Sequence, residues 1–215
     1  ITRIIAETIT GKKPIIINMT EYSHSTAINN IIGSSAGFIG SDSKTELPFD
    51  CLESNPYQII LLDEFEKGHK EVQRLFMRVF DEGLLQTNRS TTVDFSKAII
   101  IATTNAAHKE VKKTLGFGSG SPISKTTEVE ELKKWFDAEL INRFEHIINF
   151  NTIYIDIIKD IYATESARIS KISHSINLKP EIDPDDLQKM RDEYVPDFGA
   201  RPAFNIVREY IENQV

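Results

Sequence analysis

The chain has 215 residues, of which 40% are hydrophobic and 27% are charged, the balance of an ordinary globular protein. No apolar run approaches the roughly 20 residues needed to cross a bilayer, and the first residues show no signal-peptide pattern. We therefore expect no membrane partner. A single cysteine, Cys51, excludes an internal disulfide, and together with the missing export signal this makes the reducing cytoplasm the expected compartment. The net charge of -7 and the pI near 5.3 disfavour nucleic acid as a partner.

The chain opens with a helical pattern that is followed by a strand-like run. Isoleucines at helical spacing in residues 1–9 predict an amphipathic helix, and residues 11–14 predict the turn that ends it. Residues 14–19 form a continuous apolar run rich in isoleucine. Such a run is typical of a strand covered on both faces, as in a parallel sheet.

Two further runs of the same kind follow, with a helix between them. Residues 57–63 and 98–104 predict buried strands, and residues 71–80 predict an amphipathic helix. The apolar face of this helix consists of Val72, Leu75, Phe76 and Val79. The alternation of strands with helices indicates an α/β layered sheet.

A stretch rich in glycine, serine, threonine and lysine separates the third strand from the next regular elements. We interpret residues 106–127 as a mobile loop. A helix is expected over residues 129–140, with Trp135 and Phe136 as packing residues, and a short fourth strand over residues 145–150.

The last 60 or so residues show no buried-strand pattern. Helical periodicity extends over residues 154–172, 184–194 and 201–213, and the second of these helices has proline in its first turn. We therefore expect two domains, a large α/β domain over residues 1–151 and a small helical domain over residues 152–215.

The strongest chemical signal lies at the end of the second strand. Four apolar residues, 59–62, are followed by two adjacent carboxylates, Asp63 and Glu64. In open α/β sheets, ligands bind beyond the carboxyl ends of the strands. Nucleotide hydrolysis needs one carboxylate to hold Mg²⁺ and a second group to position the attacking water, and these two residues have the right types. A buried strand that ends in a polar turn is the alternative.

Three other polar residues are candidates for the same chemistry. Asn105 ends the third strand and could hydrogen-bond a phosphate or the attacking water, although a turn or cap residue is the alternative. Arg143 lies between apolar residues and could reach across an interface to a transferring phosphoryl group, or be an ordinary solvated arginine. Arg201 begins the last helix, where a positive charge opposes the helix dipole, and this misfit favours a ligand-binding role.

A glycine-punctuated loop over residues 33–40 carries an aromatic side chain. Phe38 and Ile39 lie between Gly37 and Gly40, and the loop lacks the Gly-Lys-Ser/Thr ending of a phosphate-binding loop. A loop that presents Phe38 to a polypeptide fits better, with a Phe38 ring tucked into the core as the alternative. The five histidines show no paired metal-ligand spacing, and no serine lies in a G-x-S-x-G elbow.

Taken in order, these segments resemble the second nucleotide-binding domain of the Clp-type AAA+ unfoldases and disaggregases, over nearly the whole chain. The matching segments, in order, are 15–22 (the strand and "DMSEY" segment), 37–40 (the pore loop), 61–67 (Walker B), 80–85 with 92–95 (the hairpin region), Asn105 (sensor 1), 141–143 (the arginine-finger segment) and 199–202 (sensor 2). Several motifs that match in the same order identify the family much more specifically than any single motif does.

The resemblance implies an AAA+ P-loop NTPase-type three-layer sandwich with a parallel sheet, followed by a helical lid. It also implies ATP and Mg²⁺ as cofactors and a homo-oligomeric ring, usually a hexamer, with ATP at the subunit interfaces. Asp63 would hold Mg²⁺ through water, and Glu64 and Asn105 would act in hydrolysis. Arg143 would act on the nucleotide of the neighbouring subunit and Arg201 on that of its own. The pore loop would grip unfolded or aggregated protein substrates.

The sequence departs from the family pattern in four places. The Walker A motif G-x-x-x-x-G-K-[ST] should precede Ile1 and is absent, so we expect this stretch alone to bind ATP poorly while the parent protein hydrolyses it. Asn18 replaces an acidic residue, Phe38 replaces a tyrosine, and residues 136–140 lack the usual Arg-Pro. The alternative function is a non-catalytic AAA+ scaffold. A DNA-acting AAA+ protein is disfavoured by the acidic balance and by the Gly-Phe-Ile-Gly loop.

Overall fold

The computed structural model describes residues 1–34, 46–106, 125–150, 157–172, 178, 181–195 and 200–214. The chain divides into two compact units, Ile1–His146 and Ile147–Val215. The helices of the first unit are α1 (Thr2–Thr10), α2 (Asn29–Ile32), α3 (Lys70–Glu82), α5 (Lys125–Leu132) and α6 (Ala138–Ile141), together with the short 3-10 helices η1 (Met19–Tyr22), η2 (Ser25–Ile28), η3 (Asp50–Leu52) and η4 (Phe65–Lys67). Its strands are β1 (Ile15–Asn18), β2 (Ile59–Asp63), β3 (Leu84–Gln86), β4 (Thr92–Asp94) and β5 (Ile99–Ala102).

Three of these strands form a parallel sheet in the order β1-β2-β5. Asn18 pairs with Asp63 and Leu62 pairs with Ala102, so all three strands end at the same edge. The predicted strands over 14–19, 57–63 and 98–104 are therefore confirmed. Strands β3 and β4 form a separate antiparallel hairpin, in which Leu85 faces Val93.

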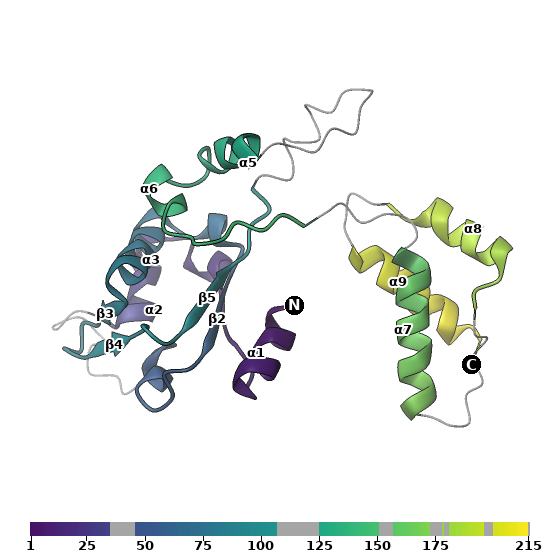
Figure 1. The fold of residues 1–215 in the computed structure, drawn as a ribbon, viewed down its shortest axis with the longest axis horizontal. Helices are drawn as coiled ribbons and strands as arrows, with labels where there is room; N and C mark the ends of the chain where they lie inside the picture. Colours follow the sequence, from purple (N-terminus) through teal and green to yellow (C-terminus); the bar gives the residue numbers. More distant parts are fainter. Residues whose placement is uncertain are drawn as a thin grey trace. The chain divides into compact units, whose positions relative to one another are not determined.

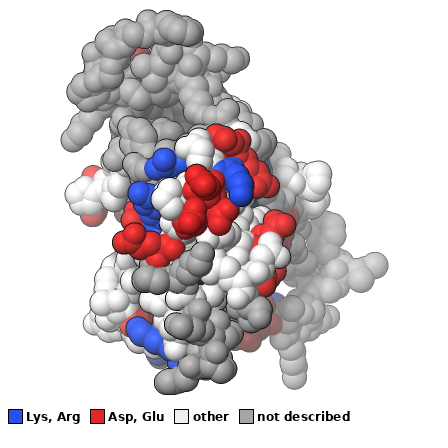
Figure 2. Space-filling view, turned by 90° about the vertical axis from the view of Figure 1, so that its right-hand side faces the viewer, with Lys and Arg blue, Asp and Glu red and all other residues white. Residues whose placement is uncertain are grey.

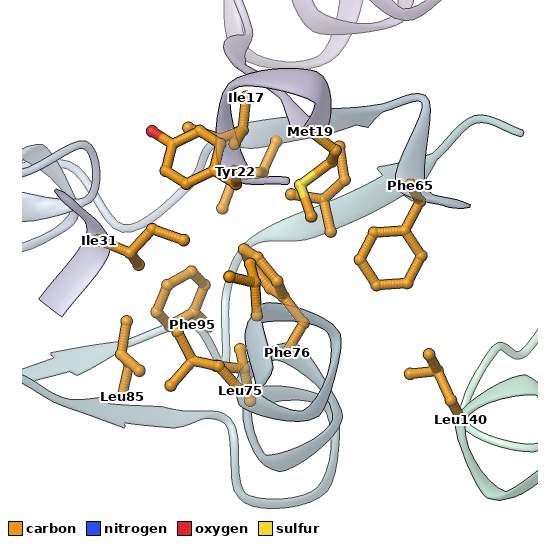
Figure 3. Close-up of a cluster of buried hydrophobic side chains, with 14 of the residues drawn as sticks. Ile17, Met19, Tyr22, Ile31, Phe65, Leu75, Phe76, Leu85, Phe95 and Leu140 are labelled. Carbon is orange, nitrogen blue, oxygen red and sulfur yellow. The ribbon is translucent and has the colours of Figure 1, made fainter. Parts of the chain in front are cut away.

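The two faces of the parallel sheet are covered unequally. Ile17 and Leu62 face the main core, where they pack with Phe76 of α3 (Figure 3). The short helix α1 contacts β2 on the other face (Figure 1). Ile16 and Ile99 remain 45% and 46% exposed there. The expectation of strands buried on both faces is therefore correct for the central strand β2 and wrong for β1 and β5, which carry these two half-exposed isoleucines.

Helix α3 forms where its sequence predicts and has clear ends. The Nδ1 atom of His69 accepts a hydrogen bond from the Glu71 N–H at the start of the helix. Gly83 ends it in the left-handed conformation, with φ of 68°, and its N–H donates to the Val79 carbonyl at 2.8 Å. The predicted apolar face is buried, as the exposures of Val72, Leu75, Phe76 and Val79 are 0–3%.

Two predictions for residues 125–150 are wrong. The helix expected over 129–140 is broken into α5 and α6. Between them, Phe136 turns into the core and its ring stacks on that of Phe65 at 5.6 Å. The Trp135 carbonyl accepts a hydrogen bond from the Lys70 ammonium group. The strand expected over 145–150 is not formed, because none of the described strands pairs with it. Helix α5 also begins inside the expected loop 106–127, and residues 107–124 of that loop lie outside the described residues.

The second unit is helical. It consists of α7 (Ile157–Ile172), α8 (Pro184–Glu193) and α9 (Ala200–Glu212), which confirms the three predicted helices over the residues described. Helices α7 and α9 pack side by side (Figure 1) around Ile158, Tyr162 and Val207, which are at most 2% exposed. Asp183 caps α8 by accepting the Asp185 N–H at 3.0 Å, and Pro184 takes its first position.

Candidate functional site

Asp63 and Glu64 lie at the carboxyl edge of the parallel sheet, at the end of its central strand. Strand β2 is held between β1 and β5, and Ile59, Ile60 and Leu62 are at most 1% exposed. The buried strand therefore fixes the position of the two carboxylates that follow it, and both side chains are half-buried. A buried strand that delivers acidic groups to this edge has the layout of a ligand site in an open α/β sheet.

Thr103, which follows β5, is hydrogen-bonded to both of these residues. Its hydroxyl donates a hydrogen bond to Asp63 Oδ1 at 2.5 Å and accepts one from the Glu64 N–H at 3.1 Å. Glu64 itself has a left-handed backbone, with φ of 54° and ψ of 51°. Non-glycine residues rarely adopt this conformation, and such residues concentrate at functional sites.

Asn105 is tied to the same turn through Glu66. The Asn105 N–H donates to Glu66 Oε1 at 3.2 Å. The other oxygen, Glu66 Oε2, is buried and has no hydrogen-bond partner in the described part of the chain. The structure therefore brings three of the predicted site residues, Asp63, Glu64 and Asn105, to one place at the sheet edge.

An aromatic cluster connects this turn to the segment that carries Arg143. Phe65 points from the end of β2 into the core (Figure 3). Its ring stacks on Phe136 at 5.6 Å and meets Phe144 edge-on at 6.3 Å. Phe144 also meets Phe80 of α3 at 5.2 Å. Phe136, within the break between α5 and α6, and Phe144, which follows α6, are thus packed against the residue that follows Glu64.

Arg143 is held by carboxylates of its own chain. It forms an ion pair with Asp81 of α3, and a second ion pair with Glu139 of α6 at 3.2 Å. The hydrogen bond to Asp81 is the main cause that raises the pKa of this guanidinium above its ordinary value. The sequence singled out Arg143, but nothing in the sequence pattern pointed to Asp81 as its partner.

The remaining predicted site residues belong to the helical unit or lie outside the described residues. Arg201 is the second residue of α9, in the helical unit, and is exposed. Gly199, from the same motif, lies outside the described residues, as do the predicted pore-loop residues Gly37, Phe38, Ile39 and Gly40.

Asp63 fits a magnesium ion bound together with phosphates. Among the described residues there is no group of three or more His, Cys, Asp or Glu that could hold a metal ion by itself. Mg²⁺ is usually bound by only one or two carboxylates, with waters and substrate phosphates as the other ligands. One oxygen of Asp63 receives the Thr103 hydroxyl, which leaves the other as a ligand for the metal or its water. The 215 residues contain no G-x-x-x-x-G-K-[ST] motif for the phosphates.

Two contributors to the site were not assigned from the sequence. These are Thr103, which bonds Asp63 and Glu64, and Glu66, which accepts the Asn105 N–H. The position of Thr103 follows from the parallel pairing of β2 with β5. Leu62 pairs with Ala102, so the residues that come next, Asp63 and Thr103, lie side by side.

The surface drawn in Figure 2 has mixed charge. Among the residues drawn in colour there, acidic and basic side chains lie close together, and the basic ones form no continuous field. In the described part of the chain, no helix has the length and apolar character to span a membrane.

Comparisons with known proteins identify relatives of this chain. The family model described as AAA domain (Cdc48 subfamily) matches residues 1–147. The ATP-dependent Clp protease ATP-binding subunit ClpE of Bacillus subtilis is 31% identical over 223 residues, which cover 100% of this chain and 31% of that protein. ClpL of Staphylococcus aureus is 30% identical over 209 residues, 95% of this chain and 28% of that protein. The chain thus spans about a third of the length of these relatives.

The fold is also that of a solved structure. A closed-state cryo-EM reconstruction of Hsp104 with ATPγS and FITC casein has a TM-score of 0.78 to this chain at 24% sequence identity. The likeness covers 99% of this chain and 37% of the Hsp104 chain.

Proposed function

Because the chain belongs to the AAA domain family of the Cdc48 subfamily, with Clp ATPase subunits among its relatives, we propose that its sheet edge is an ATP-hydrolysis site. One observation carries this proposal. The buried central strand delivers Asp63 and Glu64 to the carboxyl edge, beside the turn that carries Asn105. In the full-length protein, hydrolysis drives protein unfolding and the threading of polypeptide chains, with unfolded or aggregated proteins as substrates.

Each residue at the edge has a distinct part in this proposal. Asp63 holds Mg²⁺ through water, and bound Mg²⁺ supplies charge neutralisation at the phosphates of ATP. Glu64 positions the attacking water and takes up its proton. Asn105 donates a side-chain hydrogen bond to the water or to the terminal phosphate. The phosphate cradle itself is expected from a Walker A motif elsewhere in the full-length protein.

We propose that the site is completed between subunits of a homo-oligomeric ring, a hexamer as in the family pattern. Arg143 serves the nucleotide of the neighbour, and Arg201, from a helical lid over residues 152–215, serves the nucleotide bound to the large domain over residues 1–151. The loop from Gly37 to Gly40 contacts the polypeptide in the channel. The Hsp104 reconstruction, which contains both ATPγS and casein, supports substrates of this class. The protein acts in the cytoplasm.

The test is Glu64→Gln in the full-length protein. The amide keeps the shape of the side chain and loses the carboxylate, so ATP binding should remain while hydrolysis slows by roughly 10²- to 10⁴-fold. The variant should accumulate as an ATP-bound ring in size-exclusion chromatography. Unchanged turnover would show that Glu64 has no such role. A wild-type protein that binds ATP and never hydrolyses it would instead identify a non-catalytic scaffold.

A further inference from the structure

Thr103 is hydrogen-bonded to both residues that carry the proposed catalytic carboxylates. Its N–H donates to the Leu62 carbonyl at 3.0 Å, and its own carbonyl accepts the Phe65 N–H at 2.9 Å. These backbone bonds lie on either side of Asp63 and Glu64. The hydroxyl then uses both its donor and its acceptor capacity on those two residues. Thr103 therefore contacts four successive residues, from Leu62 to Phe65.

The hydroxyl acts on the orientation of Asp63. A donor at 2.5 Å from Oδ1 has the short length of a charge-assisted O–H···O⁻ hydrogen bond. It engages one carboxylate oxygen and so restricts the rotation of the carboxylate, which leaves the other oxygen available to a ligand. Removal of a residue that hydrogen-bonds a metal ligand typically lowers the affinity of the site for the metal.

The same hydroxyl acts on the backbone of Glu64. A glutamate with φ of 54° adopts a conformation that costs free energy unless other contacts hold it. The Glu64 N–H is satisfied by the Thr103 hydroxyl, and the next N–H, of Phe65, is satisfied by the Thr103 carbonyl. Without the hydroxyl, this peptide group loses its partner and the direction of the Glu64 side chain is no longer fixed.

We propose that Thr103 is a positioning residue for ATP hydrolysis, whose hydroxyl orients the Asp63 carboxylate and fixes the turn at Glu64. The inference rests on the proposed roles of Asp63 and Glu64. Thr103 is exposed, so its hydroxyl has no part in filling the core and its removal leaves no buried cavity. A change in turnover after that removal therefore reports on the site itself.

The experiment compares four variants of the full-length protein. Thr103→Val keeps the shape and removes the hydroxyl, Thr103→Ala is a second and smaller hydroxyl-free variant, and Thr103→Ser keeps the hydroxyl. The matched control is Thr104→Val, since Thr104 is the exposed neighbour whose hydroxyl accepts the Ala106 N–H at 3.1 Å and touches neither carboxylate. Steady-state ATPase rates are measured across a Mg²⁺ titration and across an ATP titration, and melting temperatures are recorded in parallel.

For Thr103→Val and Thr103→Ala, we expect kcat to fall about 10- to 100-fold and the half-saturating Mg²⁺ concentration to rise. Thr103→Ser should stay within about threefold of wild type, and Thr104→Val should match wild type. Loss of the hydroxyl without a change in kcat or Mg²⁺ dependence overturns the inference. An equal loss in Thr104→Val, or no rescue by serine, also overturns it, because either would indicate a merely structural role.

Two further variants separate this inference from the proposed function. Asp63→Asn and Glu64→Gln are assayed in the same series. If both keep wild-type turnover, the proposed hydrolysis site is wrong and the inference fails with it. If both lose turnover while Thr103→Val keeps it, only the role of Thr103 is refuted.

Discussion

Gln73 supports the turn that follows the catalytic carboxylates, and its replacement tests how that turn is held. Gln73 lies on α3 and is 3% exposed. Its Nε2 donates to the carbonyls of Phe65 at 3.3 Å and Gly68 at 3.0 Å. In Gln73→Leu both bonds are lost, but the Phe65 carbonyl still accepts the Gly68 N–H. The cost is therefore mainly that of one buried carbonyl left without its donor.

We expect Gln73→Leu to lower the free energy of unfolding by about 1–3 kcal/mol. The assay is urea unfolding of the 215-residue chain, followed by the fluorescence of Trp135, its only tryptophan. Trp135 reports on the first unit, where its carbonyl binds Lys70. Amide exchange at Lys67 and Gly68 should also become faster, since the turn loses its support.

The matched control is Gln86→Leu on β3, in the same unit as Trp135. Gln86 is exposed. Such a surface change usually alters the free energy of unfolding by no more than about 0.5 kcal/mol. The reasoning is refuted if Gln73→Leu unfolds at the same urea concentration as wild type, or if the two variants are destabilised equally.

Three further predictions concern the full-length protein. Arg143→Ala should reduce hydrolysis by about 10³- to 10⁵-fold without weakening nucleotide binding to an isolated subunit. Mixing these subunits with wild type should inhibit the wild-type neighbours, and mixed rings without such inhibition would show that Arg143 only pairs with Asp81 and Glu139. Phe38→Ala should abolish unfolding of a tagged test protein while basal ATPase activity and melting temperature stay nearly constant. Phe38→Tyr should restore the unfolding activity. A large drop in the melting temperature of Phe38→Ala would instead place the ring in the core. Burial raises the pKa of the Cys51 thiol, so at neutral pH iodoacetamide should alkylate Cys51 more slowly in the folded protein than in urea, and equal rates would contradict this.

The arrangement of the sheet edge could be predicted because it depends on strong local patterns. Apolar runs of four or five residues become buried strands, and parallel strands that follow helical connections end at a common edge. Asp63 and Asn105 both follow such runs, so their proximity follows from the pattern and the topology together. The same reasoning placed α3 correctly, since four apolar residues on one face leave little choice of orientation.

The errors arise where tertiary contacts override a local pattern. Residues 129–140 have a helical sequence, yet the stacking of Phe136 on Phe65 interrupts the helix. Residues 145–150 have a strand-like sequence, but a strand needs the edge of a neighbour, and periodicity does not reveal whether one is present. The ion pair of Arg143 with Asp81 joins segments far apart in the chain, and a lone pattern around either residue does not predict it.

The left-handed backbone of Glu64 shows most clearly why a motif does not by itself define a site. The two adjacent acidic residues specify which groups are available, but a glutamate has no intrinsic preference for a positive φ. In the structure this conformation coincides with two bonds from Thr103, the residue that follows β5. Its hydroxyl satisfies the Glu64 N–H and its carbonyl satisfies the Phe65 N–H. In our proposal the direction of the Glu64 side chain depends on Thr103, which follows another strand, β5. A sequence in which the two acidic residues were kept and that hydroxyl was lost would still match the motif, and we expect it to hydrolyse ATP poorly.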